Sequence, residues 1–171
     1  MQLTKGVEQA ICIIVLLATQ ESSAPLASDE ISKRLAVSPS YMKKITRKLV
    51  VQGIAVSVPG NNGGVSLAKP ATDITMLDVI EAMEGSIHLY PDTGLIRLAF
   101  QDGEYAQRGQ EILRNVFSQA DRVLIEYLSK VTAADLLKEG LGMTNLPVLN
   151  WNQESLSDVL NKEQDDQNEN V

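Results

Sequence analysis

The chain has 171 residues, 44% of them hydrophobic, and a formal net charge of −7. This length suits one domain, or a small domain with an extension, and an acidic chain is a poor candidate for indiscriminate binding to polyanions. The charge is unevenly placed, because residues 1–85 carry eight basic and eight acidic side chains, whereas residues 86–171 carry seven and fourteen. Any surface for nucleic acid is therefore expected in the first half.

Cysteine and histidine are too scarce for a disulfide or a four-ligand metal site, because Cys12 and His88 are the single residues of their types. Cys12 lies among isoleucines, which favours a buried, inert thiol over a redox sensor. No catalytic triad or phosphate-binding glycine motif is apparent, so we expect no enzyme, no metal and no cofactor. No signal peptide is apparent, and the apolar run at residues 10–18 is shorter than the roughly 20 residues of a membrane span, so we expect a cytoplasmic protein without a membrane partner.

Three helices are predicted in the first 52 residues. Thr4 is expected to cap a helix that runs to about Gln20, and Ser28 to cap a second, shorter helix. After a tight turn, Ser38 is expected to cap a third helix, with Pro39 at the first helical position, where its missing N–H costs little. The residues expected to face the core are Val7, Ile11, Ile14, Val15 and Ala18 in the first helix and Ile31 and Leu35 in the second.

A β-hairpin is predicted directly after the third helix. Gly53 ends the helix, and the alternation of Ile54, Val56 and Val58 predicts a strand with these side chains on one buried face. Residues 59–64 are rich in glycine and asparagine, which tolerate positive φ, so they predict a turn before a return strand.

A fourth helix and a connector come next. Thr75 and Asp78 have the spacing of a capping box, which predicts a helix over residues 76–83. Residues 86–103 have weak periodicity and predict a connector, with a helical piece around residues 95–100.

The longest periodic segment runs from Tyr105 to Lys130. A helix of this span would be on the order of 39 Å long, too long to be covered by the N-terminal domain. Its wide apolar face therefore predicts contact with a second protomer. The residues expected in this dimer contact are Ile112, Val116, Ala120, Val123 and Tyr127.

The C-terminal part is predicted to contain one short helix, a packing anchor and a disordered tail. Thr132 and Asp135 repeat the capping-box spacing and predict a short helix over residues 133–138. Trp151 is expected to be a packing anchor for the C-terminal segment. The tail from about Asn161 lacks apolar residues until its last position and is expected to be disordered.

The third predicted helix carries four cations and no carboxylate on its outward side. Such a face repels itself unless an anion compensates it. A DNA major groove does so, because phosphates neutralise the flanking charges while long cationic side chains reach guanine O6 and N7. A solvated charged face would be the simpler interpretation of the helix alone, but the preceding helix and turn and the following hairpin favour DNA binding. Its expected inward residues are Met42, Ile45 and Leu49, and its outward rows are Lys43 with Arg47 and Lys44 with Lys48.

The hairpin is interpreted as the wing of a winged helix. Its tip would lie along the minor groove, where Asn61 and Asn62 could donate to adenine N3 and thymine O2. An ordinary surface turn is the alternative, and the position of the hairpin directly after the basic helix disfavours it.

Several segments resemble the IscR/NsrR/CymR family of bacterial winged-helix transcriptional regulators. The matching segments are residues 1–5, 38–42, 60 with 63–64, 73–85 and, more weakly, 131–137. The resemblance covers about residues 1–140 and implies a homodimer, joined by the long helix, on an imperfect palindrome of double-stranded DNA. It also implies that the start of the third helix reads DNA, here Ser40, Lys43 and Lys44.

The sequence departs from this family in three places. The wing arginine of the family is Pro59 here, so minor-groove contact is either lost or made by the asparagines. The aromatic residue usual in the first helix is Gln9. The iron–sulfur members carry three cysteines before the long helix, whereas residues 86–105 contain none. The sequence therefore predicts a cluster-free branch that senses a small molecule, a protein partner or nothing.

The fold class predicted is mainly α with a small β-hairpin wing, a winged helix-turn-helix domain plus a long dimerisation helix. The predicted parts are the domain at residues 1–85, a connector at 86–104, dimerisation helices at 105–140 and an extension at 141–171. The predicted function is a sequence-specific DNA-binding regulator that acts as a homodimer, and a repressor is favoured over an activator. The alternatives are a protein-interaction module that has lost DNA binding and a thiol switch at Cys12. The residues expected to contact DNA are Thr4, Lys5, Ser38, Ser40, Tyr41, Lys43, Lys44, Arg47, Lys48, Asn61, Asn62, Gly63 and Gly64.

Overall fold

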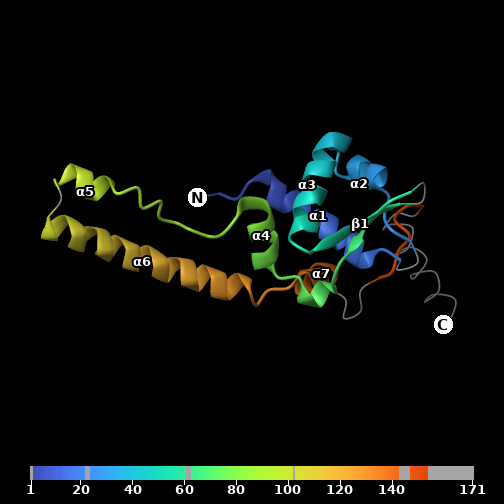
Figure 1. Cartoon of the computed structure of the whole chain (residues 1–171). Coiled ribbons are helices and arrows are strands. Elements are labelled where there is room, and N and C mark those ends of the chain that lie inside the picture. Colours follow the sequence, from blue (N-terminus) through green and yellow to red (C-terminus); the bar gives the residue numbers. More distant parts are fainter. Residues whose placement is uncertain (1, 22–23, 61–62, 102, 143–146, 154–171) are drawn as a thin grey trace.

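A helical head with a small hairpin occupies one end of the molecule, and a long helix extends away from it (Figure 1). The computed structural model describes residues 2–21, 24–60, 63–101, 103–142 and 147–153. The mainly α fold with a two-stranded wing confirms the predicted fold class. The first three helices are α1 (Lys5–Thr19), α2 (Ser28–Arg34) and α3 (Pro39–Val51).

The caps of these helices agree with the sequence prediction at α3 only. The Ser38 hydroxyl accepts a hydrogen bond from the Tyr41 N–H at the start of α3. Thr4 precedes α1 but makes no capping bond, because its hydroxyl donates to the Glu84 carboxylate instead. Ser28 is the first residue of α2 and not its cap, so this prediction was wrong; Ala27 holds the capping position.

The core of the head lies where α1, α3 and α4 meet. Met42, Ile45 and Leu49 of α3 are buried, as predicted. The predicted core stripe of α1 was partly wrong, because α3, α4, α7 and β2 all pack on this helix and bury a wider face than one stripe. The buried apolar residues of α1 are Val7, Ala10, Ile13, Ile14 and Leu17, whereas Ile11, Val15 and Ala18 are half-buried.

The wing consists of β1 (Ala55–Val58) and β2 (Gly64–Leu67), which pair in antiparallel register. Ile54 is buried, but Val56 and Val58 are exposed, so the predicted single buried face was wrong. The reason is that the sheet has two strands only, and its base alone touches the core. The tip residues Asn61 and Asn62 lie outside the described residues.

A capping box starts α4 (Met76–Glu84), which follows the short 3-10 helix η1 (Ala71–Asp73). The Thr75 hydroxyl accepts from the Asp78 N–H, and the Asp78 carboxylate accepts from the Thr75 N–H, as the sequence predicted. Burial raises the pKa of Asp78, but the Thr75 N–H and the Lys69 ammonium at 2.9 Å outweigh it and lower the pKa overall.

The second predicted capping box also forms. Thr132 and Asp135 exchange the same pair of hydrogen bonds at the start of α7 (Ala133–Leu141), which is longer than predicted. The Ala133 N–H donates to the Ile74 carbonyl at 2.8 Å, so α7 lies against the head beside the start of α4. The predicted division of the chain at residues 85, 104 and 140 stays a proposal.

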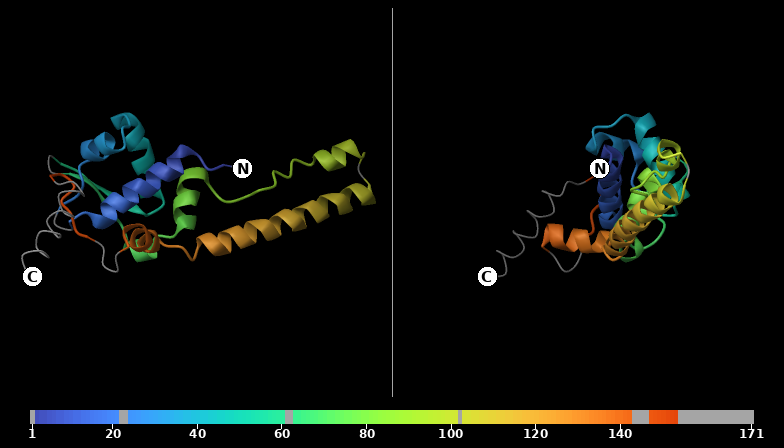
Figure 2. Two further views of the ribbon diagram at one scale, coloured as in Figure 1. Left: turned by 180° about the vertical axis from the view of Figure 1, so that it is seen from behind. Right: turned by 90° about the vertical axis from the view of Figure 1, so that its left-hand side faces the viewer.

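The connector after α4 leads away from the head alongside α6 (Glu104–Leu128), which returns toward the head (Figure 2). The connector includes the short helix α5 (Leu95–Ala99). The Tyr90 ring stacks on Phe117 of α6, with ring centroids 5.3 Å apart. The Asp92 carboxylate accepts from the Gln110 amide of α6 at 2.6 Å, and Arg114 also pairs with it; both hydrogen bonds lower the pKa of Asp92. Side chains of α6 therefore hold the connector in place.

The other side of α6 is not covered by any described residue of this protomer. The helix α6 has 25 residues and is therefore about 37 Å long. Val123 is 69% exposed, and the rest of the predicted dimerisation stripe, Ile112, Val116, Ala120 and Tyr127, is exposed as well. Among the described residues, no helix is both long and apolar enough to cross a membrane.

The segment at residues 147–153 packs on the head. Leu149 and Trp151 are buried in the main core, which confirms the expected role of Trp151 as a packing anchor. The tail predicted to be disordered from Asn161 onward lies outside the described residues.

Candidate nucleic-acid interface

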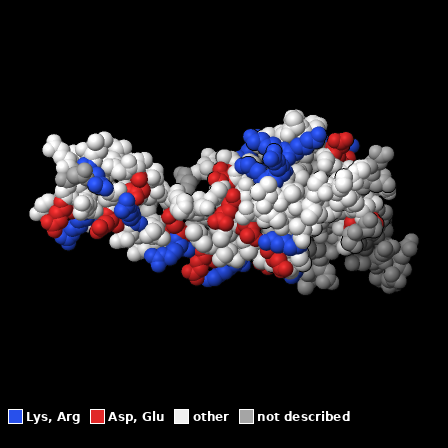
Figure 3. Space-filling view, viewed as in Figure 1, with Lys and Arg blue, Asp and Glu red and all other residues white. Residues whose placement is uncertain are grey.

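Basic side chains gather over α3 on one face of the head (Figure 3). Lys43, Lys44 and Arg47 are exposed on this helix, and α3 contains no acidic residue. Ser40 and Tyr41 are exposed in its first turn, next to the N–H groups that the helix leaves unpaired. This arrangement offers hydroxyl groups and cations at the end of a helix where anions bind favourably.

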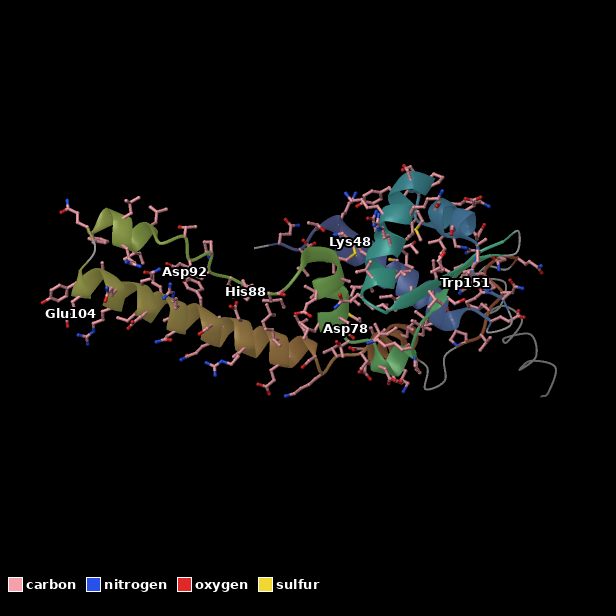
Figure 4. All side chains as sticks on the ribbon, in the orientation of Figure 1. Lys48, Asp78, His88, Asp92, Glu104 and Trp151 are labelled. Carbon is pink, nitrogen blue, oxygen red and sulfur yellow. The ribbon has the colours of Figure 1, made fainter. Side chains whose placement is uncertain are left out.

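Lys48, the fourth predicted outward cation, lies between α3 and the end of α4. Its side chain is half-buried, and its ammonium donates to the Met83 carbonyl at the end of α4, 2.5 Å away (Figure 4). The prediction that Lys48 points outward in a row with Lys44 was therefore wrong. Helical spacing could not reveal this contact, because α4 reaches α3 only through the tertiary fold.

The start of α1 lies beside the exposed basic face of α3. Thr4 and Lys5 are exposed, and the Thr4 N–H donates to the Glu84 carboxylate at 3.1 Å. The hydrogen bonds from Thr4 lower the pKa of Glu84. A groove of about 310 Å³ separates this first turn from α3, and its lining includes Thr4, Gly6, Tyr41, Lys44 and Glu84.

The wing glycines Gly63 and Gly64 allow backbone segments to pack closely. A Cβ atom on Gly64 would lie 2.2 Å from the Leu26 carbonyl oxygen, and one on Gly63 would lie 2.2 Å from the Val58 carbonyl oxygen. These contacts account for both glycines without any bound DNA. Pro59 lies between β1 and the tip, where the resemblance implied an arginine.

Cys12 is exposed in this protomer, so its predicted burial was wrong. Partial burial of the sulfur and the nearby Glu8 carboxylate raise the pKa of the thiol. Because the thiolate is the reactive form, a raised pKa makes Cys12 a poor oxidant sensor at neutral pH.

The described part of the chain contains no group of three or more histidine, cysteine, aspartate or glutamate side chains arranged to hold a metal ion. Iron–sulfur clusters are held by about four ligands, mostly cysteine thiolates. One cysteine and one histidine in the whole sequence do not fit such a group.

The fold and the basic α3 define a winged helix-turn-helix protein of the DNA-binding class. Comparison with known families gives the same class: a model of the Rrf2 family, described as iron-dependent transcriptional regulators, matches residues 3–139. The chain belongs to the Rrf2 family, a class of transcriptional regulators and not of enzymes.

Two curated relatives illustrate the match. YffB of Lactococcus lactis, which bears the name of an HTH-type transcriptional regulator, is 34% identical over 139 residues, covering 81% of this chain and 88% of that protein. YwgB of Bacillus subtilis, named in the same way, is 46% identical over 101 residues. That second match covers 59% of this chain and 65% of YwgB, just under two thirds of its length.

Solved structures show the same fold. CymR of Bacillus subtilis, described as the global cysteine regulator, aligns over 80% of this chain and 95% of its own, with a TM-score of 0.57 and 22% identity. IscR of T. potens aligns over 82% and 88%, with a TM-score of 0.58 and 23% identity.

Proposed function

We propose that this protein is a sequence-specific transcriptional repressor that binds a palindromic DNA operator as a homodimer and holds no iron–sulfur cluster. The observation that carries this proposal is the exposed cationic face of α3, directly after a turn and directly before the wing. Lys43, Lys44 and Arg47 are aimed at solvent on a chain whose net charge is −7, so the face is a local feature.

The contacts proposed for each part of the interface follow from its geometry. The start of α3, with Ser38, Ser40, Tyr41, Lys43 and Lys44, would enter the major groove, and Arg47 would contact a flanking phosphate. Thr4 and Lys5 at the start of α1 would contact the DNA backbone. Lys48 is left out of the proposed interface, because its half-buried ammonium donates to the Met83 carbonyl.

The exposed stripe of α6 supports the dimer. Large apolar side chains along a helix that leaves the head need a cover, and a second copy of the same helix supplies one. Two heads on one twofold axis match a palindrome. Binding would block promoter DNA, and a small molecule or protein signal would act by changing the relative placement of the two heads.

Replacing Lys44 tests base contact by α3. Once the preferred sequence has been selected from a random DNA pool, Lys44→Ala is expected to weaken binding to it by ~1–3 kcal/mol and to relax the choice of one base. Lys48→Met is the matched control, because it removes a cation of the same helix whose half-buried ammonium already donates to the Met83 carbonyl; its operator affinity and salt dependence should match the wild type. Equal affinity of Lys44→Ala and wild type for the operator would rule out base contact there.

The selection also separates this proposal from a protein-interaction module. A steep fall of affinity with rising salt, together with preference for one palindrome over random DNA, is expected for the regulator. Transcription in vitro from a promoter that carries the selected palindrome then distinguishes repression from activation. Absence of any selected sequence would favour the interaction module.

The donor set supports the cluster-free part of the proposal. The connector, where a cluster would be expected from the resemblance, is held on α6 by Tyr90 and Asp92 and contains no cysteine. We expect protein purified under anaerobic conditions to contain no stoichiometric iron or sulfide and to bind its operator as tightly as an aerobic preparation. Iron and acid-labile sulfide near one cluster per protomer would contradict the proposal.

A further inference from the structure

Residues 147–153, here called the C-terminal strap, dock on the head beyond the part of the chain that the Rrf2 family model covers. Leu149 is 1% exposed and forms a parallel bridge with Gln20 at the end of α1. Its N–H donates to the Thr19 carbonyl and its carbonyl accepts from the Glu21 N–H, both at 2.8 Å. The strap is therefore integrated into the fold by backbone bonds as well as by its side chains.

Trp151 connects the end of α1 with the end of α2. Its indole N–H donates to the Thr19 hydroxyl at 2.8 Å, in the buried interior. Its carbonyl accepts from the Arg34 guanidinium at 2.7 Å, and the same guanidinium lies 4.8 Å from the centroid of the indole ring. Arg34, the last residue of α2, also pairs with Glu30 at 2.8 Å. The C-terminal end of α2 is therefore fixed to the strap.

Asn152 fixes the opposite end of α2. Its side-chain oxygen accepts from the Ala27 N–H at 3.0 Å, and its amide nitrogen donates to the Pro25 carbonyl at 3.3 Å. Ala27 holds the capping position of α2 and has no side-chain acceptor of its own. Asn152 thus supplies, from a distance of 125 residues in sequence, the acceptor for the backbone N–H of the capping residue.

The position of α2 depends on such contacts, because it has seven residues. Isolated helices shorter than about 12–15 residues are marginal in water, so neighbours decide where a helix of this length lies. The helix α3 packs directly on α2, as well as on α1, α4 and β1, and a short turn joins α2 to the start of α3 that carries Lys43 and Lys44. A displacement of α2 is therefore passed to Lys43 and Lys44.

We propose that Trp151 and Asn152 are positioning residues for DNA recognition, which orient α3 by holding both ends of α2. This inference rests on the proposed function, in which α3 contacts the bases. Base contacts need precise geometry, whereas attraction between cations and phosphates tolerates small rotations. Loosening the strap should therefore reduce operator binding more than binding to random DNA.

The test uses Asn152→Ala in the full-length chain, with Trp151→Leu as a second variant, which removes both the indole N–H that bonds Thr19 and the ring on which Arg34 of α2 packs. Measurements are made well below the melting temperature, where circular dichroism shows a folded protein. Operator affinity is expected to fall roughly five- to tenfold for each variant, from the loss of one or two net hydrogen bonds. Affinity for random DNA of equal length should change less than about twofold, so the ratio of the two affinities falls.

Val148→Ala is the matched control, because this strap residue is exposed and its change should alter neither affinity. In Asn152→Ala, fluorescence of Trp151, the single tryptophan, reports strap docking, and acrylamide should quench it more than in the wild type. A lower melting temperature with an unchanged affinity ratio in both variants would overturn the inference and leave the proposed function intact. A wild-type protein that prefers no DNA sequence would overturn the proposed function, and the inference with it.

Discussion

Val123→Asp is expected to convert the protein from a dimer to a monomer and to lower its operator affinity by about 10²-fold or more. Val123 lies in the exposed apolar stripe of α6 and is 69% exposed in the single protomer. A twofold interface places the new carboxylate in the contact twice, where burying an unpaired charge is strongly unfavourable. A monomer keeps one head only and loses the avidity of two linked half-site contacts.

The same exposure makes the experiment specific. Because the side chain touches little in the protomer, the new charge should cost the head little stability. Ser118→Asp is the matched control: Ser118 is exposed on the same helix and, at 100° per residue, lies on nearly the opposite side from Val123. It adds the same charge and should leave both the dimer and the operator affinity unchanged.

Analytical ultracentrifugation at micromolar protein gives the oligomeric state, and fluorescence anisotropy with the selected palindrome gives the affinity. A Val123→Asp protein that stays dimeric with wild-type affinity would show that α6 does not form the interface. A monomer that still binds the palindrome as tightly as wild type would show that one head suffices.

Local signals were the part of the fold that the sequence predicted well. Ser38 caps α3, and Thr75 with Asp78 forms the capping box of α4, because each of these bonds spans three residues and needs no tertiary partner. The burial of Met42 and Leu49 followed from helical spacing alone, because one side of α3 faces the core.

Errors arose where distant segments decide the outcome. Val56 and Val58 alternate as a buried strand would, yet no described residue covers them beyond the two-stranded wing. Lys48 continues a cationic row in sequence, but the end of α4 binds its ammonium. Cys12 has isoleucine neighbours in sequence, but its own side of α1 is exposed in the protomer.

The contacts of the strap also could not be predicted from the sequence. From the sequence, Trp151 is expected to be a packing anchor for the C-terminal segment. Its partners Thr19 and Arg34 lie more than a hundred residues away, and no spacing rule connects them. The proposed role of Asn152 depends wholly on the tertiary structure.

Gly64→Ala is expected to destabilise the protein by about 3 kcal/mol, near the upper end of the usual cost of overpacking. The new Cβ would lie 2.2 Å from the Leu26 carbonyl oxygen and 2.6 Å from its carbon, so β2 must move away from the Leu26 backbone. That movement breaks the two bonds between Leu26 and Val65, which are 3.0 and 2.9 Å long. Leu26 is fully buried and leads into α2, so the displacement disturbs the core and not only the wing.

Gly140→Ala is the control for this change, because Gly140 lies inside α7 with open space around its Cα. Alanine is the better helix former, so this variant should be stabilised by up to about 1 kcal/mol. Urea denaturation gives both free energies of unfolding. The sequence had assigned Gly64 to DNA contact, whereas the structure gives it a packing role, and the two roles predict different results. If Gly64→Ala keeps the wild-type stability while its DNA affinity falls, the glycine serves the DNA; a large loss of stability shows that it serves the fold.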